Sequence, residues 1–344
     1  MRIADPWRLT VRFRRNNPGK RIADSLPALE IDPVAMDAFS EMDPLHELPG
    51  AMSNKFMVVV GLEIPKWGKR GKIIDYGWGV GKGLLRMYPW QPLFERKVST
   101  EKEPDLDRLK REIREFASSA GYSLCGFTKI DRRFIAGGRD DKFPFDTAIV
   151  LGMEMDRELL EEVPFQGKRL FDFEVYVESG RRVFEVAQFI RSRGYRCRAR
   201  VPFDGWVKYP PHAIMAGLGE LGAHGVVITR EHGPRQRWTM ISIDADIEPD
   251  EPVDLGIAEY CDDCMLCVKA CPGDAISHER IWWRGVKKRK NNDTKCYPFF
   301  RKYDGCGICI KVCPINHHGF EACMEAYNKD GTILGNTDSS RKRN

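Results

Sequence analysis

The sequence contains no apolar run that approaches the length of a membrane-spanning helix, which is about 20 residues. Near the amino terminus Arg14 and Arg15 are followed by the polar residues 16–21, and not by the apolar stretch of a twin-arginine export signal. Hydrophobic residues make up 42% of the chain and charged residues 31%, the composition of an ordinary folded protein. We therefore expect a cytoplasmic protein with no membrane segment.

The fingerprints of nucleotide-binding loops are also missing. The glycines of residues 77–83 do not fit G-x-G-x-x-G, and no G-K-S or G-K-T ending follows them. Tryptophan and tyrosine residues crowd the same stretch, residues 67–90, as they do where a flat ligand or an apolar substrate binds. A flexible surface loop and a wall of a cofactor or substrate pocket both stay open for this segment.

Positive charge exceeds negative charge only slightly. The net charge of +5 permits an acidic partner or a phosphate-bearing cofactor, but it is low for a protein that binds nucleic acid. The one dense basic run, RGVKKRK at residues 284–290, is of a kind that usually forms a solvated loop. We therefore do not expect a nucleic-acid partner.

Cysteine, in contrast, is concentrated in one region, where eight of the 11 cysteines lie between residues 261 and 313. The first four follow the spacing C-x2-C-x2-C-x3-C-P, which holds one iron–sulfur cluster and lends a ligand to a second. A second run keeps only the last part of this pattern, and Cys296 is the best replacement for its missing first cysteine. Exchange of the fourth ligands predicts two [4Fe-4S] sites: Cys261, Cys264 and Cys267 with Cys313, and Cys296, Cys306 and Cys309 with Cys271.

Zinc and disulfides are the alternatives for these cysteines. Zinc sites seldom use a third cysteine two residues on and a fourth with proline after it, so the clusters are favoured. Low-potential clusters also fit a reducing compartment. The other cysteines, Cys125, Cys197 and Cys323, have no pairing pattern, and we expect them to be buried free thiols.

The hydrophobic pattern predicts a mixed α+β fold. It favours helices at residues 105–120 and 170–193, strands at 56–62, 122–130, 147–155 and 196–201, and a hairpin that joins residues 226–229 to 237–243. The expected organisation is an amino-terminal arm (residues 1–100), a core (101–255) and a cluster domain (256–330).

The order of three motifs resembles that of the cobalamin-dependent reductive dehalogenases and of the related epoxyqueuosine reductases. The motifs are AGLGELGAHG (residues 216–225), GPRQRW (233–238) and the double cysteine segment. The resemblance implies a nitroreductase-like cobalamin-binding core with an appended two-cluster ferredoxin-like domain. It also implies that the amino-terminal arm (residues 1–100) contacts cobalamin and substrate. It implies base-off cobalamin and two [4Fe-4S] clusters as cofactors, with a separate ferredoxin- or flavodoxin-type electron donor.

The same resemblance implies a reaction, in which electrons relayed through the clusters generate Co(I) for reductive dehalogenation of a small, aromatic organohalide. Tyr176 is similar to the tyrosine that donates the proton, and Arg237 and Arg301 resemble the family's basic residues. A phenol has a pKa near 10, and a neighbouring cation makes it a better acid. Residues expected to contact the cofactor are Gly217, Gly219, Gly222 and His224, the histidine by hydrogen bonding and not as a cobalt ligand.

Other functions stay open. A tRNA-modifying enzyme of the epoxyqueuosine reductase type would place its acid near Asp204, although Trp206, Lys208 and Tyr209 differ from the small residues expected after that aspartate. The substrate could also lack a halogen. A plain electron carrier is the third alternative, but it needs neither a pocket nor a placed phenol.

Overall fold

The computed structural model describes residues 96, 98, 101–135, 142–164, 173–202, 207–283, 286–303 and 305–335. The expected arm (residues 1–100) lies almost wholly outside these residues, together with the predicted strand 56–62 and the aromatic segment 67–90. Residues 203–206, which include Asp204, also lie outside them.

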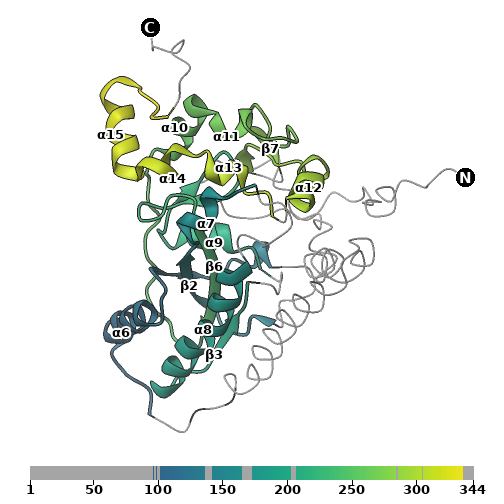
Figure 1. Ribbon diagram of the computed structural model, residues 1–344. Coiled ribbons are helices and arrows are strands. Elements are labelled where there is room, and N and C mark those ends of the chain that lie inside the picture. The colour runs from purple at the N-terminus through teal and green to yellow at the C-terminus, as the bar shows by residue number, and fades with distance from the viewer. Residues whose placement is uncertain are drawn as a thin grey trace, which may run out of the picture.

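A four-stranded antiparallel sheet forms the centre of the core (Figure 1). Its order is β1 (Leu124–Lys129), β2 (Thr147–Glu154), β6 (Gln236–Ile243) and β3 (Cys197–Arg200). The strands β2 and β6 are buried along nearly their whole length on both faces, which is the pattern of strands covered on both sides. The sheet therefore needs a layer of helices on each face.

Two helices, α6 (Leu106–Ser119) and α8 (Phe173–Ser192), cover one face of this sheet. Asp105 caps α6 by accepting a hydrogen bond from the Arg108 N–H, and Gly121 leaves the helix with a positive φ of 87°. The apolar stripes of the two helices meet inward-facing strand residues, among them Leu109, Ile113, Val183, Ile190, Phe127, Ile149 and Ile241. The predicted helices 105–120 and 170–193 are thus confirmed over their described residues.

A shorter helix, α9 (Tyr209–Met215), packs on the opposite face of the sheet. Its Ala213 and Ile214 contact the other side chains of the same strands, including Ala148, Val150 and Met240. The core is therefore a sandwich of helix, sheet and helix, which agrees with the predicted mixed α+β class.

The predicted hairpin between residues 226–229 and 237–243 is wrong. The strand β5 (Val227–Ile228) pairs with β4 (Glu220–Leu221), whereas β6 pairs with β2 and β3. Only a single bridge, Thr229 to Gly233, joins the ends of the turn. β6 is buried on both faces, and its partner strands lie far away in the sequence. Nearness in the sequence therefore does not predict this pairing.

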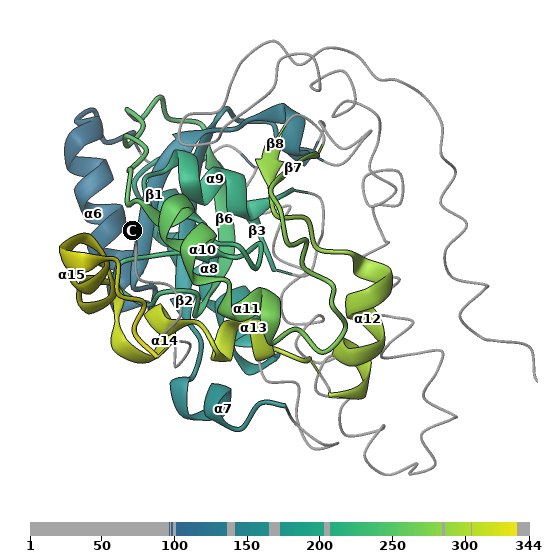
Figure 2. The ribbon, with the colours of Figure 1, turned by 90° about the horizontal axis from the view of Figure 1, so that it is seen from above.

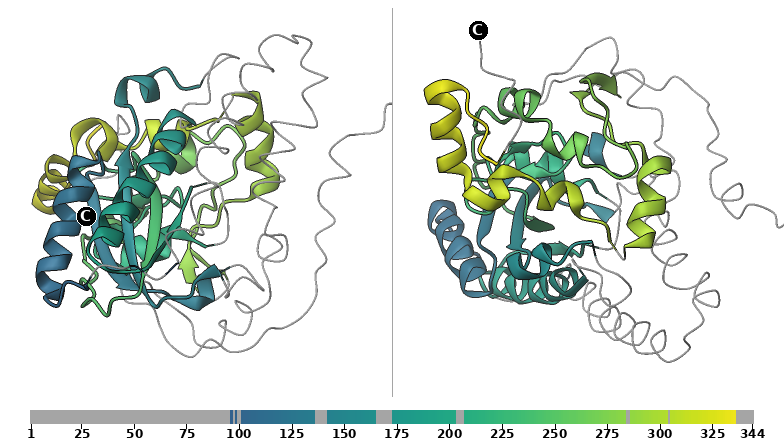
Figure 3. Two further views of the ribbon diagram at one scale, coloured as in Figure 1. Left: turned by 90° about the horizontal axis from the view of Figure 1, so that it is seen from below. Right: turned by 45° about the horizontal axis from the view of Figure 1, so that its top comes forward.

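The cysteine segment folds into short helices at one end of the core, above the sheet in Figure 1 and in front of it in Figure 2. The right panel of Figure 3 separates the same two parts. The elements are α10 (Ile257–Cys264), α11 (Leu266–Lys269), β7 (Ile281–Trp283), β8 (Val286–Lys288), α12 (Asp293–Lys302), α13 (Ile308–Lys311), α14 (Pro314–His318) and α15 (Phe320–Asp330). None of the helices in the described ranges is long and apolar enough to cross a membrane.

Two contacts fasten this segment to the core. The carboxylate of Glu220, on β4, accepts hydrogen bonds from the N–H groups of Leu255 (2.6 Å) and Ile257 (2.9 Å), where α10 begins. The helix α7 (Arg157–Glu161), which follows β2, receives the Lys311 ammonium of α13 on the carbonyl oxygen of Glu161. Backbone groups that a short helix leaves unpaired thus bind the cysteine segment to the sheet.

Candidate active site

The eight cysteines of the segment divide into two groups by the thiols that surround each one. Burial raises the pKa of the Cys313 thiol, and its thiol neighbours are Cys261 and Cys264. Burial also raises the pKa of the Cys309 thiol to about 12, and its thiol neighbours are Cys306, Cys296 and Cys271. These neighbours are the ones expected from the two predicted ligand sets. Cys267 lies near the other three members of the first set and also near Cys309 of the second.

Backbone N–H groups point at the sulfurs of both groups. The N–H of Ala275 donates to the Cys271 sulfur at 3.3 Å, and a hydrogen bond from the backbone of Ala223 opposes the pKa increase of Cys261. Such donors favour thiolate, the form that binds iron. Within the described ranges no group of three or more Cys, His, Asp or Glu side chains is arranged to hold a metal ion. A cubane keeps its cysteine sulfurs further apart than a single ion does.

The remaining cysteines are free thiols, as predicted. Cys197 and Cys323 are buried, whereas Cys125 is only partly so. Cys323 lies in the apolar core of the cysteine segment and belongs to neither ligand set.

Tyr176 and Arg237 meet on the α8 face of the sheet. The Arg237 guanidinium carbon lies over the Tyr176 ring, 5.4 Å from its centroid. Arg237 reaches this place because it opposes Met153 on β2 and lies on the same face of β6 as Thr239 and Ile241. The structure thus brings together two residues that are 61 positions apart in sequence.

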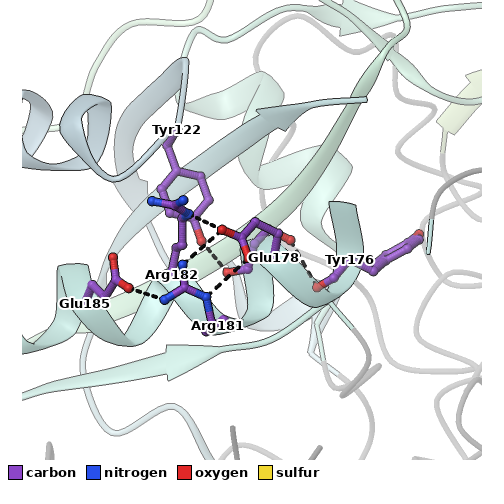
Figure 4. Close-up of polar contacts among 7 residues, drawn as sticks. Tyr122, Tyr176, Glu178, Arg181, Arg182 and Glu185 are labelled. Carbon is purple, nitrogen blue, oxygen red and sulfur yellow. Dashed lines mark hydrogen bonds and ion pairs between the residues drawn. The ribbon is translucent and has the colours of Figure 1, made fainter. Parts of the chain in front are cut away.

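A network of ion pairs fixes the helix turn that carries Tyr176. Glu178 binds both Arg181 and Arg182, and Arg181 also binds Glu185. The hydrogen bond from Arg181 lowers the pKa of Glu178 to about 2. Figure 4 shows the Tyr176 ring pointing away from this network, so that the network orients the backbone and leaves the ring available.

Buried hydroxyl groups add to this support. The Tyr122 hydroxyl donates to the carbonyl oxygen of Ser179, and the Ser179 hydroxyl donates to that of Tyr176 at 3.3 Å. The Thr239 hydroxyl donates to the Tyr122 oxygen at 3.3 Å. Burial strongly raises the pKa of Tyr122, so this phenol stays protonated and structural.

The start of α8 and the second group of cysteines share one apolar cluster. Val175, the residue before Tyr176, packs against an apolar cluster that includes Met155 and Leu160. Ile308 and Cys309 of α13 pack against the same cluster. The start of α8 is therefore near a predicted cluster ligand, as transfer of electrons toward this region requires.

Close contacts with other parts of the chain explain why glycine occupies these positions of the AGLGELGAHG motif. Gly217 and Gly219 have positive φ angles of 70° and 156°, and a side chain at either would strike the carbonyl oxygen of Glu251 or Ile228. A side chain at Gly222 would strike the His224 ring. The close approaches are thus to the chain's own atoms, and cofactor contact by these glycines stays a prediction.

His224 and His212 are both buried but differ in their partners. His212 is satisfied, because its ring nitrogens bind the Lys208 carbonyl and the Asp131 N–H. For His224, Nδ1 accepts from the Val226 N–H, while Nε2 has no hydrogen-bond partner among the described residues. Burial lowers the pKa of His224 to about 4, so its ring is neutral at pH 7.

Arg301 is the last of the predicted site residues, and Arg235 lies two positions before Arg237. Arg301 lies in α12, and its side chain is outside the described part. Arg235 does not join Tyr176 but binds Glu154 and Asn316. Two aspartates that follow β6 form ion pairs with other residues, Asp244 with Arg196 and Lys102, and Asp246 with Lys129.

Sequence reasoning missed the roles of Glu220 and Arg289. Glu220 stands inside the glycine motif, and its burial beside helix α10 was not visible in the pattern. Arg289 belongs to the basic run expected to be solvated, yet it is 8% exposed and paired with Asp262. The sequence contains one indication of the role of Glu220, which is that it is the one carboxylate among the glycines of residues 216–225.

Comparison with known proteins extends this description. Residues 260–317 match the family described as 4Fe-4S dicluster domain. The chain is 29% identical over 219 residues to the tetrachloroethene reductive dehalogenase of Sulfurospirillum multivorans, covering 56% of this chain and 42% of that protein. It is 30% identical over 238 residues to the Desulfitobacterium hafniense enzyme of the same name, covering 64% and 41%. Over more than half of its length the chain is thus similar in sequence to reductive dehalogenases.

Further matches include an epoxyqueuosine reductase and two solved structures. The epoxyqueuosine reductase of Lactococcus garvieae is 32% identical over 118 residues, 30% of each chain. A solved catabolic reductive dehalogenase, in complex with 3-bromo-4-hydroxybenzoic acid, has a TM-score of 0.61 at 22% identity and covers 70% of this chain and 37% of its own. Another, described as a B12-dependent dehalogenase, has a TM-score of 0.59 at 24% identity, covering 68% and 36%. These structures support a shared fold of helices and sheet; this chain spans about two fifths of the dehalogenases it resembles in sequence.

Proposed function

We propose that the chain is a cobalamin-dependent reductase that removes halide from a small aromatic organohalide, with electrons supplied through two [4Fe-4S] clusters. The observation that carries the proposal is the placement of the Arg237 guanidinium over the Tyr176 ring, on the side of the core where Cys309 packs. An electron carrier has no need of such a pair.

The residues fit the implied groups. Two groups of cysteines offer the soft thiolate sulfurs that iron–sulfur clusters use. For cobalamin, His224 Nε2 and Asn291 Oδ1 are buried polar atoms without hydrogen-bond partners in the described ranges, next to the glycine loop and Cys261. Bound in its base-off form, cobalamin would supply a low-potential cobalt centre able to reduce a carbon–halogen bond.

The chain's own groups account for the proton. Replacement of halide by hydrogen consumes two electrons and one proton and releases the halide ion. Tyr176 donates that proton from its hydroxyl to the carbon that loses the halide, and Arg237 stabilises the phenolate that remains. A guanidinium on the ring face also holds the phenol in one orientation.

The proposed substrate class follows from the relatives and from the sequence. Two relatives are named for tetrachloroethene, and a structural neighbour was solved with a brominated hydroxybenzoic acid. The aromatic segment of residues 67–90 would suit an aromatic substrate, and a non-halogenated one of similar shape is the nearest alternative. We also propose a separate ferredoxin- or flavodoxin-type protein as the electron donor.

A tRNA-modifying function is less well supported. Recognition of tRNA needs exposed lysine and arginine side chains along one face. In the basic run Arg289 is instead buried and bound to Asp262, which removes it from such a surface.

Anaerobic reconstitution followed by a comparison of substrates tests the proposal. The protein is loaded with iron, sulfide and cobalamin, and turnover is measured on a halophenol and on epoxyqueuosine-containing tRNA. We expect halide release from the halophenol and no reaction on the tRNA. Activity on the tRNA alone, or a zinc-loaded protein that does not bind cobalamin, would overturn the proposal.

A further inference from the structure

Arg289 is a buried cation at the end of the basic run. Its Nη2 forms an ion pair of 2.8 Å with Oδ1 of Asp262, and its Nη1 donates to the backbone carbonyls of His278 and Ser277. Its side chain is only 7% exposed. A buried guanidinium is costly unless it is paired and hydrogen-bonded, so these contacts hold the charge at a fixed place.

Asp262 places this pair beside a predicted cluster ligand. It follows Cys261 directly in α10, and the charges of Asp262 and Arg289 act on the Cys261 thiol with opposite signs. The side chain of Asp262 is 40% exposed, so water screens its charge more than that of Arg289. At Cys261 the adjacent carboxylate of Asp262 has the larger effect, and the buried charge of Arg289 opposes it.

The same stretch of chain also supports the other side of Cys261. Two residues after Arg289, the Asn291 Nδ2 donates to the carbonyl oxygen of His224 at 2.8 Å. The neighbouring Ala223 provides the backbone hydrogen bond to the Cys261 thiol. Residues 289–291 thus fix both a charge and a hydrogen-bonding loop against one ligand.

We propose that Arg289 is a positioning residue that raises the reduction potential of the cluster held by Cys261, Cys264, Cys267 and Cys313, and that Asp262 opposes it. Reduction adds one electron, taken from the donor protein, to a cluster and its thiolates. A fixed cation stabilises this added negative charge, and an anion destabilises it. The inference rests on the proposed function, because it needs that cluster to be present.

Redox titration of the reconstituted protein, followed by EPR, tests the inference. The Cys296→Ala variant identifies the signal of the first cluster, since it removes a ligand of the second. We expect Arg289→Gln to shift the first cluster to lower potential and Asp262→Asn to shift it to higher potential. Arg289→Lys keeps the charge and should stay near the wild-type value.

A surface arginine provides the matched control. Arg230 pairs with Glu321 in an exposed contact, with side chains 53% and 77% exposed, so Arg230→Gln changes the net charge equally and should leave the potential unchanged. Shifts of Arg289→Gln and Asp262→Asn in the same direction, or no shift in either, would overturn the inference. If Arg289→Gln does not assemble the cluster, the reduction potentials of Asp262→Asn and Arg289→Lys test the inference instead. A wild-type chain without clusters would overturn the proposed function as well, whereas clusters with unshifted potentials would overturn this inference alone.

Discussion

Tyr176 is held through its backbone, and its ring points away from the ion pairs of the next turns of α8 (Figure 4). Glu178 and Arg181 fix the turn, and Arg237 lies over the ring. This division suits a proton donor, because the hydroxyl can meet substrate without disturbing the helix.

At the residue scale, Tyr176→Phe should leave cluster assembly and cobalamin binding unchanged. It keeps the ring and its contact with Arg237 but removes the proton. General acids contribute about 10²-fold or more, so we expect turnover to fall by at least that factor. Halide release is the measurement, and Arg191→Gln, in the last turn of the same helix, is the control. Unchanged turnover in Tyr176→Phe would remove the residue from the mechanism.

Cys296 gives a second prediction at this scale. It is the residue chosen to replace the missing leading cysteine, and its thiol neighbours Cys309. Cys296→Ala should eliminate one cluster signal in EPR and about halve the iron content. Cys323→Ala is the control, since Cys323 is buried but belongs to neither ligand set. Loss of both signals, or of none, would contradict the assignment.

At the element scale, Glu220 ties β4 to the start of α10. Its two oxygens accept from the N–H groups of Leu255 and Ile257, both buried. Glu220→Ala would leave those groups without an acceptor and should lower the free energy of unfolding by about 2 kcal/mol or more. Urea denaturation measures this free energy of unfolding. Glu220→Gln keeps one acceptor oxygen and should lose less; equal losses for the two variants would argue against the hydrogen bonds.

Asp250 connects α6 with β1 through three groups. Burial alone would raise its pKa, but hydrogen bonds from Arg114, Lys110 and the Phe127 N–H hold the pKa below its usual value. Because the folded-state pKa is lowered, the stabilisation is present above the unfolded-state value and is lost as the pH falls through the folded one.

Asp250→Asn should therefore reduce stability at pH 7 by about 1–3 kcal/mol. It should also make unfolding less dependent on pH in the acidic range below the ordinary aspartate pKa, about 4. Denaturation curves at a series of pH values measure both effects. A variant that keeps the wild-type pH slope would show that Asp250 is not the titrating group.

The elements also show what the sequence could predict. Helix α6 and strand β2 were found to within one or two residues, because their periodicity and caps are local. The hairpin prediction failed because β6 pairs with strands distant in sequence, and Arg289 was misjudged because its partner Asp262 lies 27 positions away. The approach of Tyr176 and Arg237 was expected only from a family resemblance; no local pattern encodes it.

At the scale of the whole molecule, the contacts between core and cysteine segment converge near the glycine loop and the start of α8. Ala223 contacts the first cysteine group, and Val175 lies with Cys309 of the second. The account therefore requires that electrons pass from the clusters into this region and that cobalamin binds there.

The most direct test follows the optical spectrum of cobalamin in the anaerobically reconstituted protein while a low-potential donor protein reduces it. We predict that the wild-type chain binds cobalamin and that the bound cofactor is reduced, whereas in Cys296→Ala it binds but is reduced much more slowly. A chain that does not bind cobalamin, or equal rates of reduction in the two proteins, would contradict the account.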